Sequence, residues 1–259
     1  RSTLFPYTTL FRSRSVDNAG TITGAVINAD IFINDGSIGG ALTNSGTFTN
    51  AGTITGNVIN SGTLTSSVDN LNGTIANTGT FNATGTLVKA ISGAGTTKVD
   101  STLTLNNGAS IDGILNLNNG DVTVSEGSIT NHTIGTLSGA GTFALDINSG
   151  AETIDNFTLT NASTGTLNIT SLNYIGTKPT EEGTYTYNVI TGSGVTLTLA
   201  DAIKTSTEWY QATSTTHGPH TADTVQATTD WDHIHYDRWT DTTTGKMADT
   251  ELNPFSRRY

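Results

Sequence analysis

The sequence predicts an all-β protein, a parallel β-helix in which short strands coil into stacked turns. Thr, Asn and Gly dominate the composition: 29 of the 259 residues are glycine, and only 13% are charged. Strand-forming Thr, Val, Ile, Phe and Tyr alternate with Gly and Asn, which favours strands and turns over helices. A unit of Gly, then Thr or Ser, then an apolar residue also recurs along the first third of the chain.

The recurring unit keeps a fixed spacing over three turns. Gly20, Gly36 and Gly52 are 16 residues apart. After Gly62 the spacing changes, so the exact 16-residue register ends there. A repeat of this kind indicates a solenoid, because one turn is too thin to bury its own apolar residues and must stack on the next. The eight copies of the recurring unit begin at Gly20, Gly36, Gly46, Gly52, Gly62, Gly73, Gly79 and Gly85.

Each regular turn contains three short segments, and each segment contributes one inward apolar residue. These residues are Ile22, Val26 and Phe32, then Ile38, Leu42 and Phe48, then Ile54, Val58 and Leu64. Two asparagine columns have the same spacing, Asn18/Asn34/Asn50 and Asn28/Asn44/Asn60. We expect each Asn to hydrogen-bond its counterpart in the next turn and so form a structural ladder. Gly is expected at the corners because it tolerates positive φ.

The repeat weakens after Gly85, although strand-like alternation continues through 101–131, 157–161 and 165–176. Taking roughly 18 residues per turn, we expect about ten turns and assign 16–200 to the β-helix. Residues 184–203 predict a hairpin or two further strands. Residues 201–259 hold all three Trp and four of the five His, and we expect a less regular C-terminal segment there, a cap or hairpin, with a linker as the alternative.

The first 15 residues, RSTLFPYTTLFRSRS, do not belong to the repeat. They contain three of the eleven Lys and Arg residues. The stretch from Thr3 to Ser13 resembles the translation of a widely used short-read sequencing adapter. We therefore expect 1–15 to be a non-native, disordered leader; a flexible arm and a basic interaction tail are the alternatives.

Charge and cysteine content exclude several classes of function. The formal net charge is −11, and 15–177 contain only two basic residues, Lys89 and Lys98. Nucleic acid is therefore not an expected partner, because phosphates require a basic surface. The chain has no cysteine, which excludes a disulfide framework, a cysteine zinc site and thiol catalysis. No apolar run approaches the roughly 20 residues of a membrane span.

The strongest candidate for chemistry is DWDHIHYD at 230–237. In a strand, His233 and His235 share one face, with Asp230, Asp232 and Asp237 close by, and such a set can bind a divalent metal. The spacing fits no dedicated zinc motif, so we expect a polar, partly exposed strand instead.

Two further segments are expected to be turns or loops, not sites. They are HGPH at 217–220 and TTTGKM at 242–247, which lacks the first Gly and the Ser or Thr of a phosphate-binding loop.

We assign no catalytic, cofactor-binding or metal residue and no cofactor. Asp and Glu are scattered along the coil, and the single histidine there, His132, has no recognisable serine partner. The chain is therefore not expected to be an enzyme.

Two stretches resemble a known family. NSGTFTNAGTITGNVINSGTLT at 44–65 and LSGAGTFALDI at 137–147 are similar to the passenger region of bacterial autotransporter and haemagglutinin-type adhesins, and the resemblance covers about 18–200. It implies a right-handed β-helix, export across both bacterial membranes and display at the cell surface by a C-terminal barrel in the outer membrane. The lack of cysteine agrees with that route, since such passengers cross the outer membrane unfolded. We expect the chain to be an internal fragment, without its signal peptide and barrel.

The expected function is adhesion, or a structural stalk, without catalysis of its own. Expected partners are host-cell or matrix glycans and proteins, or other bacterial cells, at an extracellular location. One alternative is a stalk that carries an upstream catalytic domain such as a protease. The other is a β-helix carbohydrate-active enzyme, which would need carboxylates clustered in a groove.

Overall fold

The fold is nearly all β, a solenoid of stacked parallel strands with about seven turns, so the predicted fold class is confirmed. The computed structural model describes residues 9–10, 15–106, 108–124, 127–148, 151, 153–176, 183–200, 208–213 and 222–229. These divide into two compact units. Unit 1 contains 1–121 and 133–136, and unit 2 contains 122–132 and 137–259.

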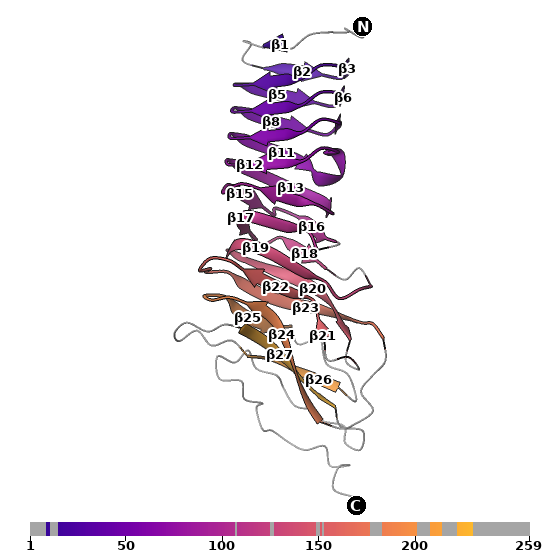
Figure 1. The fold of residues 1–259 in the computed structure, drawn as a ribbon, viewed down its shortest axis with the longest axis vertical. Coiled ribbons are helices and arrows are strands. Elements are labelled where there is room, and N and C mark those ends of the chain that lie inside the picture. Colours follow the sequence, from indigo (N-terminus) through magenta and orange to yellow (C-terminus); the bar gives the residue numbers. More distant parts are fainter. Residues whose placement is uncertain are drawn as a thin grey trace, which may run out of the picture. The chain divides into compact units, whose positions relative to one another are not determined.

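Unit 1 is a ladder of short strands that lie one above another (Figure 1). The strands are β1 (Thr9–Leu10), β2 (Val16–Asn18), β3 (Thr21–Ile22), β4 (Val26–Asn28), β5 (Ile31–Asn34), β6 (Ser37–Ile38), β7 (Leu42–Asn44), β8 (Thr47–Asn50), β9 (Thr53–Ile54), β10 (Val58–Asn60), β11 (Thr63–Ser67), β12 (Ile75–Asn77), β13 (Thr80–Leu87), β14 (Ala90–Ser92), β15 (Thr96–Lys98), β16 (Thr102–Leu105) and β17 (Ser110–Asn116). One short 3-10 helix, η1 (Val68–Asn70), follows β11. From the leader, the structure describes Ser15 and β1, which pairs in parallel with β4; the adapter origin stays a prediction.

The core of unit 1 consists of columns of inward side chains. The first column is Val16, Phe32, Phe48, Leu64, Phe81, Thr97 and Leu115. The second is Val26, Leu42, Val58, Ile75, Ile91 and Ile111. The third is Ile22, Ile38, Ile54 and Leu71. All nine apolar residues predicted to point inward are at most 4% exposed. The predicted columns are therefore confirmed.

The two asparagine columns form the expected ladders. Asn28 donates from Nδ2 to Oδ1 of Asn44 at 2.7 Å, and Asn44 repeats this bond to Asn60. The structure extends this ladder to Asn77. The other column runs from Asn18 through Asn34 and Asn50 to the hydroxyl of Ser66. These amides satisfy one another inside the core, where an unpaired polar group would be costly.

The repeat glycines have a different role from the one the sequence suggests. Among the eight, only Gly85 has positive φ, at 86°, so the expectation that corners require positive φ is wrong for the others. At six of the other seven, all except Gly20, close stacking of the backbone explains the glycine instead. A Cβ on Gly36 would lie 1.9 Å from the carbonyl oxygen of Gly20, and one on Gly52 would lie 1.8 Å from that of Gly36. Glycine is required because backbone lies directly against backbone.

The period lengthens without ending the ladder. Asn60 pairs with Asn77, 17 residues later, and the turn that contains the additional residue also contains η1 in place of a third strand. In unit 2 the parallel partners lie further apart, as Leu167 and Leu197 show. Longer turns explain why there are about seven turns and not the ten expected from a constant length.

One position in the first column is polar. Thr97 is fully buried between Phe81 and Leu115, and its hydroxyl has no hydrogen-bond partner. Replacing it with valine, which has the same shape, should stabilise the fold by about 1 kcal/mol because an unsatisfied buried hydroxyl disappears. Urea unfolding measures the change. Thr49→Val, on the exposed side of β8, is the control and should leave the free energy of unfolding nearly unchanged.

Unit 2 mixes parallel and antiparallel pairs. Its strands are β20 (Ala140–Asn148), β21 (Thr153–Ile154), β22 (Asn156–Leu159), β23 (Thr166–Tyr174), β24 (Gly183–Thr191), β25 (Thr196–Leu199), β26 (Glu208–Thr213) and β27 (Ala222–Thr229). β18 (Asp121–Thr123) and β19 (Asn131–Ser138) include the residues where the units divide. Strand β23 pairs in parallel with β20 and β25. An antiparallel hairpin, β26–β27, pairs with β24, so a less regular C-terminal hairpin is confirmed.

The segment 184–203 was expected to form a hairpin or two further strands. It contributes to two strands, β24 and β25. β24 pairs in parallel with β22 and antiparallel with β27, whereas β25 pairs with β23.

Candidate functional site

The segments that the sequence singled out for chemistry lie outside the described residues. This applies to 230–237 with His233 and His235, to 217–220 and to 242–247. Within the part of the chain that the structure describes, no group of three or more His, Asp or Glu residues is arranged to hold a metal ion. In the same part, no helix is long and apolar enough to cross a membrane.

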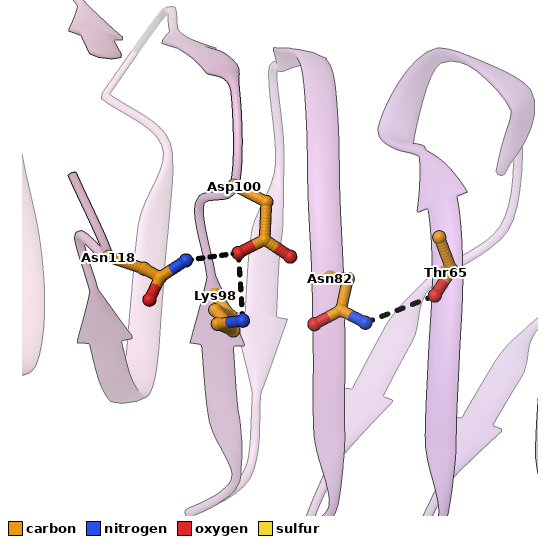
Figure 2. Close-up of polar contacts among 5 residues, drawn as sticks. All are labelled: Thr65, Asn82, Lys98, Asp100 and Asn118. Atoms are coloured by element: carbon orange, nitrogen blue, oxygen red, sulfur yellow. Dashed lines mark hydrogen bonds and ion pairs between the residues drawn. The ribbon is translucent and has the colours of Figure 1, made fainter. Parts of the chain in front are cut away.

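The outward side of unit 1 carries rows of short polar side chains. Thr49, Thr65, Asn82 and Lys98 occupy paired positions on four successive strands. Figure 2 shows the later part of this row, in which Asn82 donates to the hydroxyl of Thr65 at 3.1 Å. Lys98 forms an ion pair of 2.8 Å with Asp100, which also accepts a hydrogen bond from Asn118. This face can make many similar polar contacts along successive turns.

A pocket of about 340 Å³ opens beside η1. It lies at the turn where the 16-residue period is interrupted. Its wall combines the apolar side chain of Val88 with the polar groups of Asp69, Thr86 and Lys89. Burial lowers the pKa of Lys89 below its ordinary value.

A buried cluster of ionisable side chains lies in unit 2. His132, Asp146 and Asp155 are each 0% exposed. Asp155 accepts hydrogen bonds from the backbone N–H of Thr130 at 2.7 Å and from that of Asp146 at 2.6 Å. The hydroxyl of Thr130 lies 3.3 Å from Asp155 and 2.9 Å from Nε2 of His132. Thr130 therefore connects a carboxyl group to an imidazole.

Asp146 and Asp155 together hold the segment that precedes β19. Asp146 accepts hydrogen bonds from the backbone N–H of Gly127 and of Ser128, and Asp155 binds Thr130 in the same segment. The hairpin of β20 and β21 brings the two carboxyl groups together, since Ile147 pairs with Ile154. The arrangement can bind a proton and fix this segment. Full burial keeps its three ionisable groups away from any substrate in solution.

The cluster makes stability depend on pH. Burial, with a smaller contribution from the Asp146 carboxylate, raises the pKa of Asp155 from 3.8 to about 7. Between these values the folded protein binds a proton that the unfolded chain releases, so the associated stability falls as the pH rises through about 7. We expect the Asp155 carboxyl to make the free energy of unfolding greater at pH 5 than at pH 8, by on the order of 2 kcal/mol.

Urea unfolding across that pH range measures the effect. Asp155→Asn is the control, because it removes the titrating carboxyl and should flatten this part of the pH profile whatever its own cost in stability. A wild-type profile as flat as that of the variant would contradict the expectation.

The sequence alone could not indicate the buried cluster of His132, Asp146 and Asp155 or the pocket beside η1. Thr130 and His132 are two residues apart, but Asp155 is 25 residues from Thr130, and only the β20–β21 hairpin brings it near. The sequence does offer one signal for the pocket. Lys89 is one of only two basic residues in 15–177.

Comparisons with known proteins leave the family open. No protein-family model matches the chain, and no curated protein matches it.

Proposed function

We propose that the chain is a surface-exposed or secreted bacterial passenger module that acts in adhesion or as a structural stalk, without catalysis of its own. The resemblance of 44–65 and 137–147 to autotransporter and haemagglutinin-type passengers supports this proposal. Its partners would be glycans or proteins of host cells and matrix, or other bacterial cells. Its location would be extracellular, attached to the outer membrane.

The observation that carries the proposal is the repeated polar outer face of unit 1. Thr47, Thr63, Thr80 and Thr96 form one row, and Thr49, Thr65, Asn82 and Lys98 form the next. Each turn presents similar hydroxyl or amide groups, so a partner with repeated groups can bind through many weak contacts at once. Beneath this face, the Asn ladders and apolar columns connect each turn to the next, as a stalk under tension requires.

Adhesion is tested with beads that carry the purified chain, under flow over immobilised matrix proteins, glycans and bacterial cells. We expect retention on at least one surface. Replacing Thr47, Thr49, Thr63 and Thr65 with alanine should reduce retention while leaving the fold intact, because these side chains point outward. No retention on any surface would contradict adhesion. The stalk role is tested by pulling on the two ends of a single molecule. Unfolding at forces smaller than those that unfold other globular domains would contradict that role.

A further inference from the structure

The pocket beside η1 is a built feature of unit 1. The chain leaves β11, forms η1 and returns along β12, and Asp69 of η1 is held from two sides. Its carboxylate accepts hydrogen bonds from the hydroxyl of Ser67 at 3.0 Å and the backbone N–H of Thr86 at 3.2 Å. Gly85 has positive φ, and a Cβ there would lie 2.3 Å from both the Ser67 and Asp69 side chains. The break in the repeat therefore has a defined shape.

The two lysines of unit 1 differ in their surroundings. Lys98 forms an ion pair with Asp100 on the outer face (Figure 2). Lys89 instead donates to two backbone carbonyls, those of Leu71 and Gly73. Among the described residues, no carboxylate forms an ion pair with Lys89. The Lys89 side chain is half-buried, and its third N–H remains available.

A partly desolvated ammonium beside a pocket attracts an anionic group, because the charge has lost water without gaining a counter-ion. Burial lowers the pKa of Lys89, as expected for a partly desolvated ammonium group. Two neutral carbonyl oxygens satisfy two N–H groups, and no carboxylate among the described residues lies within ion-pair distance of the ammonium. A ligand carboxylate would supply both the third acceptor and the missing charge.

We propose that this pocket binds a saccharide unit that carries a carboxylate, such as a uronic acid, through Lys89. Its volume of about 340 Å³ lies at the lower end of the range for small-molecule sites, which suits one sugar ring. Asn72 and Thr86 provide an amide and a hydroxyl for sugar hydroxyl groups, and the exposed side chain of Val88 provides an apolar surface for ring C–H groups. The inference specifies one partner class for the proposed adhesive function and rests on that function for its biological role.

Asp69 gives the proposal a distinctive signature. Its carboxylate also lines the pocket and repels an anionic ligand. In Asp69→Asn, the remaining oxygen can still accept from Thr86 and the new amide can donate to Ser67. Removing the negative charge should therefore strengthen binding of an acidic sugar several-fold, a change that general damage to the pocket would not produce.

The test uses the full chain and three probes, D-galacturonate, D-galactose and acetate, with calorimetry and the NMR signal of the Lys89 side chain. We expect galacturonate to bind in the millimolar range, more tightly than either other probe, and to raise the Lys89 pKa. Lys89→Met should weaken binding by about tenfold or more, whereas Lys89→Arg should retain part of it. Lys98→Met is the matched control and should bind like the wild type.

Several results would overturn the proposal. Equal binding of galactose would remove the role of the carboxylate, and equal binding of acetate would remove the role of the sugar. Absence of binding, or equal losses in the two lysine-to-methionine variants, would also contradict it. If beads adhere but galacturonate does not bind, the pocket proposal fails alone; if galacturonate binds but beads do not adhere, the proposed adhesive function fails alone.

Discussion

Replacing Gly52 with alanine is expected to destabilise unit 1 by about 3 kcal/mol, because the new methyl group cannot fit between stacked backbones. Its Cβ would lie 1.8 Å from the carbonyl oxygen of Gly36. That oxygen also accepts a hydrogen bond from the N–H of Thr53 at 3.0 Å, and the N–H of Gly52 donates to Asn34 at 2.9 Å. Relief of the clash therefore requires two turns to separate and loses backbone hydrogen bonds.

Gly20 supplies a matched control within the same column. It occupies the equivalent place one repeat before Gly36, but among the described residues a Cβ there would meet only Oδ1 of Asn18, at 3.9 Å. Gly20→Ala should change the free energy of unfolding by less than about 0.5 kcal/mol. Urea unfolding of both variants measures the difference. Equal effects would show that backbone flexibility, not close stacking, selects glycine in this column.

The inward columns and the Asn ladders were predictable from the sequence for one physical reason. In stacked turns of equal length, residues in one column are separated by a constant number of positions. The spacing of Gly20, Gly36 and Gly52 therefore also identifies Phe32 with Phe48, and Asn28 with Asn44. The period alone was enough to predict these columns and ladders, as long as every turn had the same number of residues.

Features that depend on unequal turns could not be predicted in this way. The number of turns was overestimated because later turns are longer, as the separation of Leu167 from Leu197 shows. The pocket depends on how one added residue folds into η1, and the buried cluster depends on a hairpin that places Asp155 beside Asp146. The role of the repeat glycines was also misassigned, since composition does not distinguish positive φ from close approach of backbones.

Replacing Asn44 with aspartate should destabilise unit 1 by about 4 kcal/mol at pH 7, because a negative charge would be buried without a counter-charge. Asn44 is 0% exposed. Its Nδ2 donates to Oδ1 of Asn60 at 2.7 Å and to the backbone oxygens of Gly46 at 3.1 Å and Thr63 at 3.0 Å. In the variant, an anionic oxygen would face these three oxygen atoms, and the donors that hold two turns together would be absent.

Asn82→Asp is the matched control, since Asn82 lies on the outward row and pairs in register with Lys98. The hydroxyl of Thr65 can donate to the new carboxylate, so little stability should be lost. The two variants should also differ in pH dependence. Protonation at low pH restores a single donor to the buried carboxyl and removes its charge, so Asn44→Asp should recover part of its stability at pH 4 relative to wild type. Urea unfolding at pH 4 and pH 7 distinguishes the sites. If both variants behave alike, the ladder amides do not carry the connection between turns, and a stalk built on them would lack its main polar support.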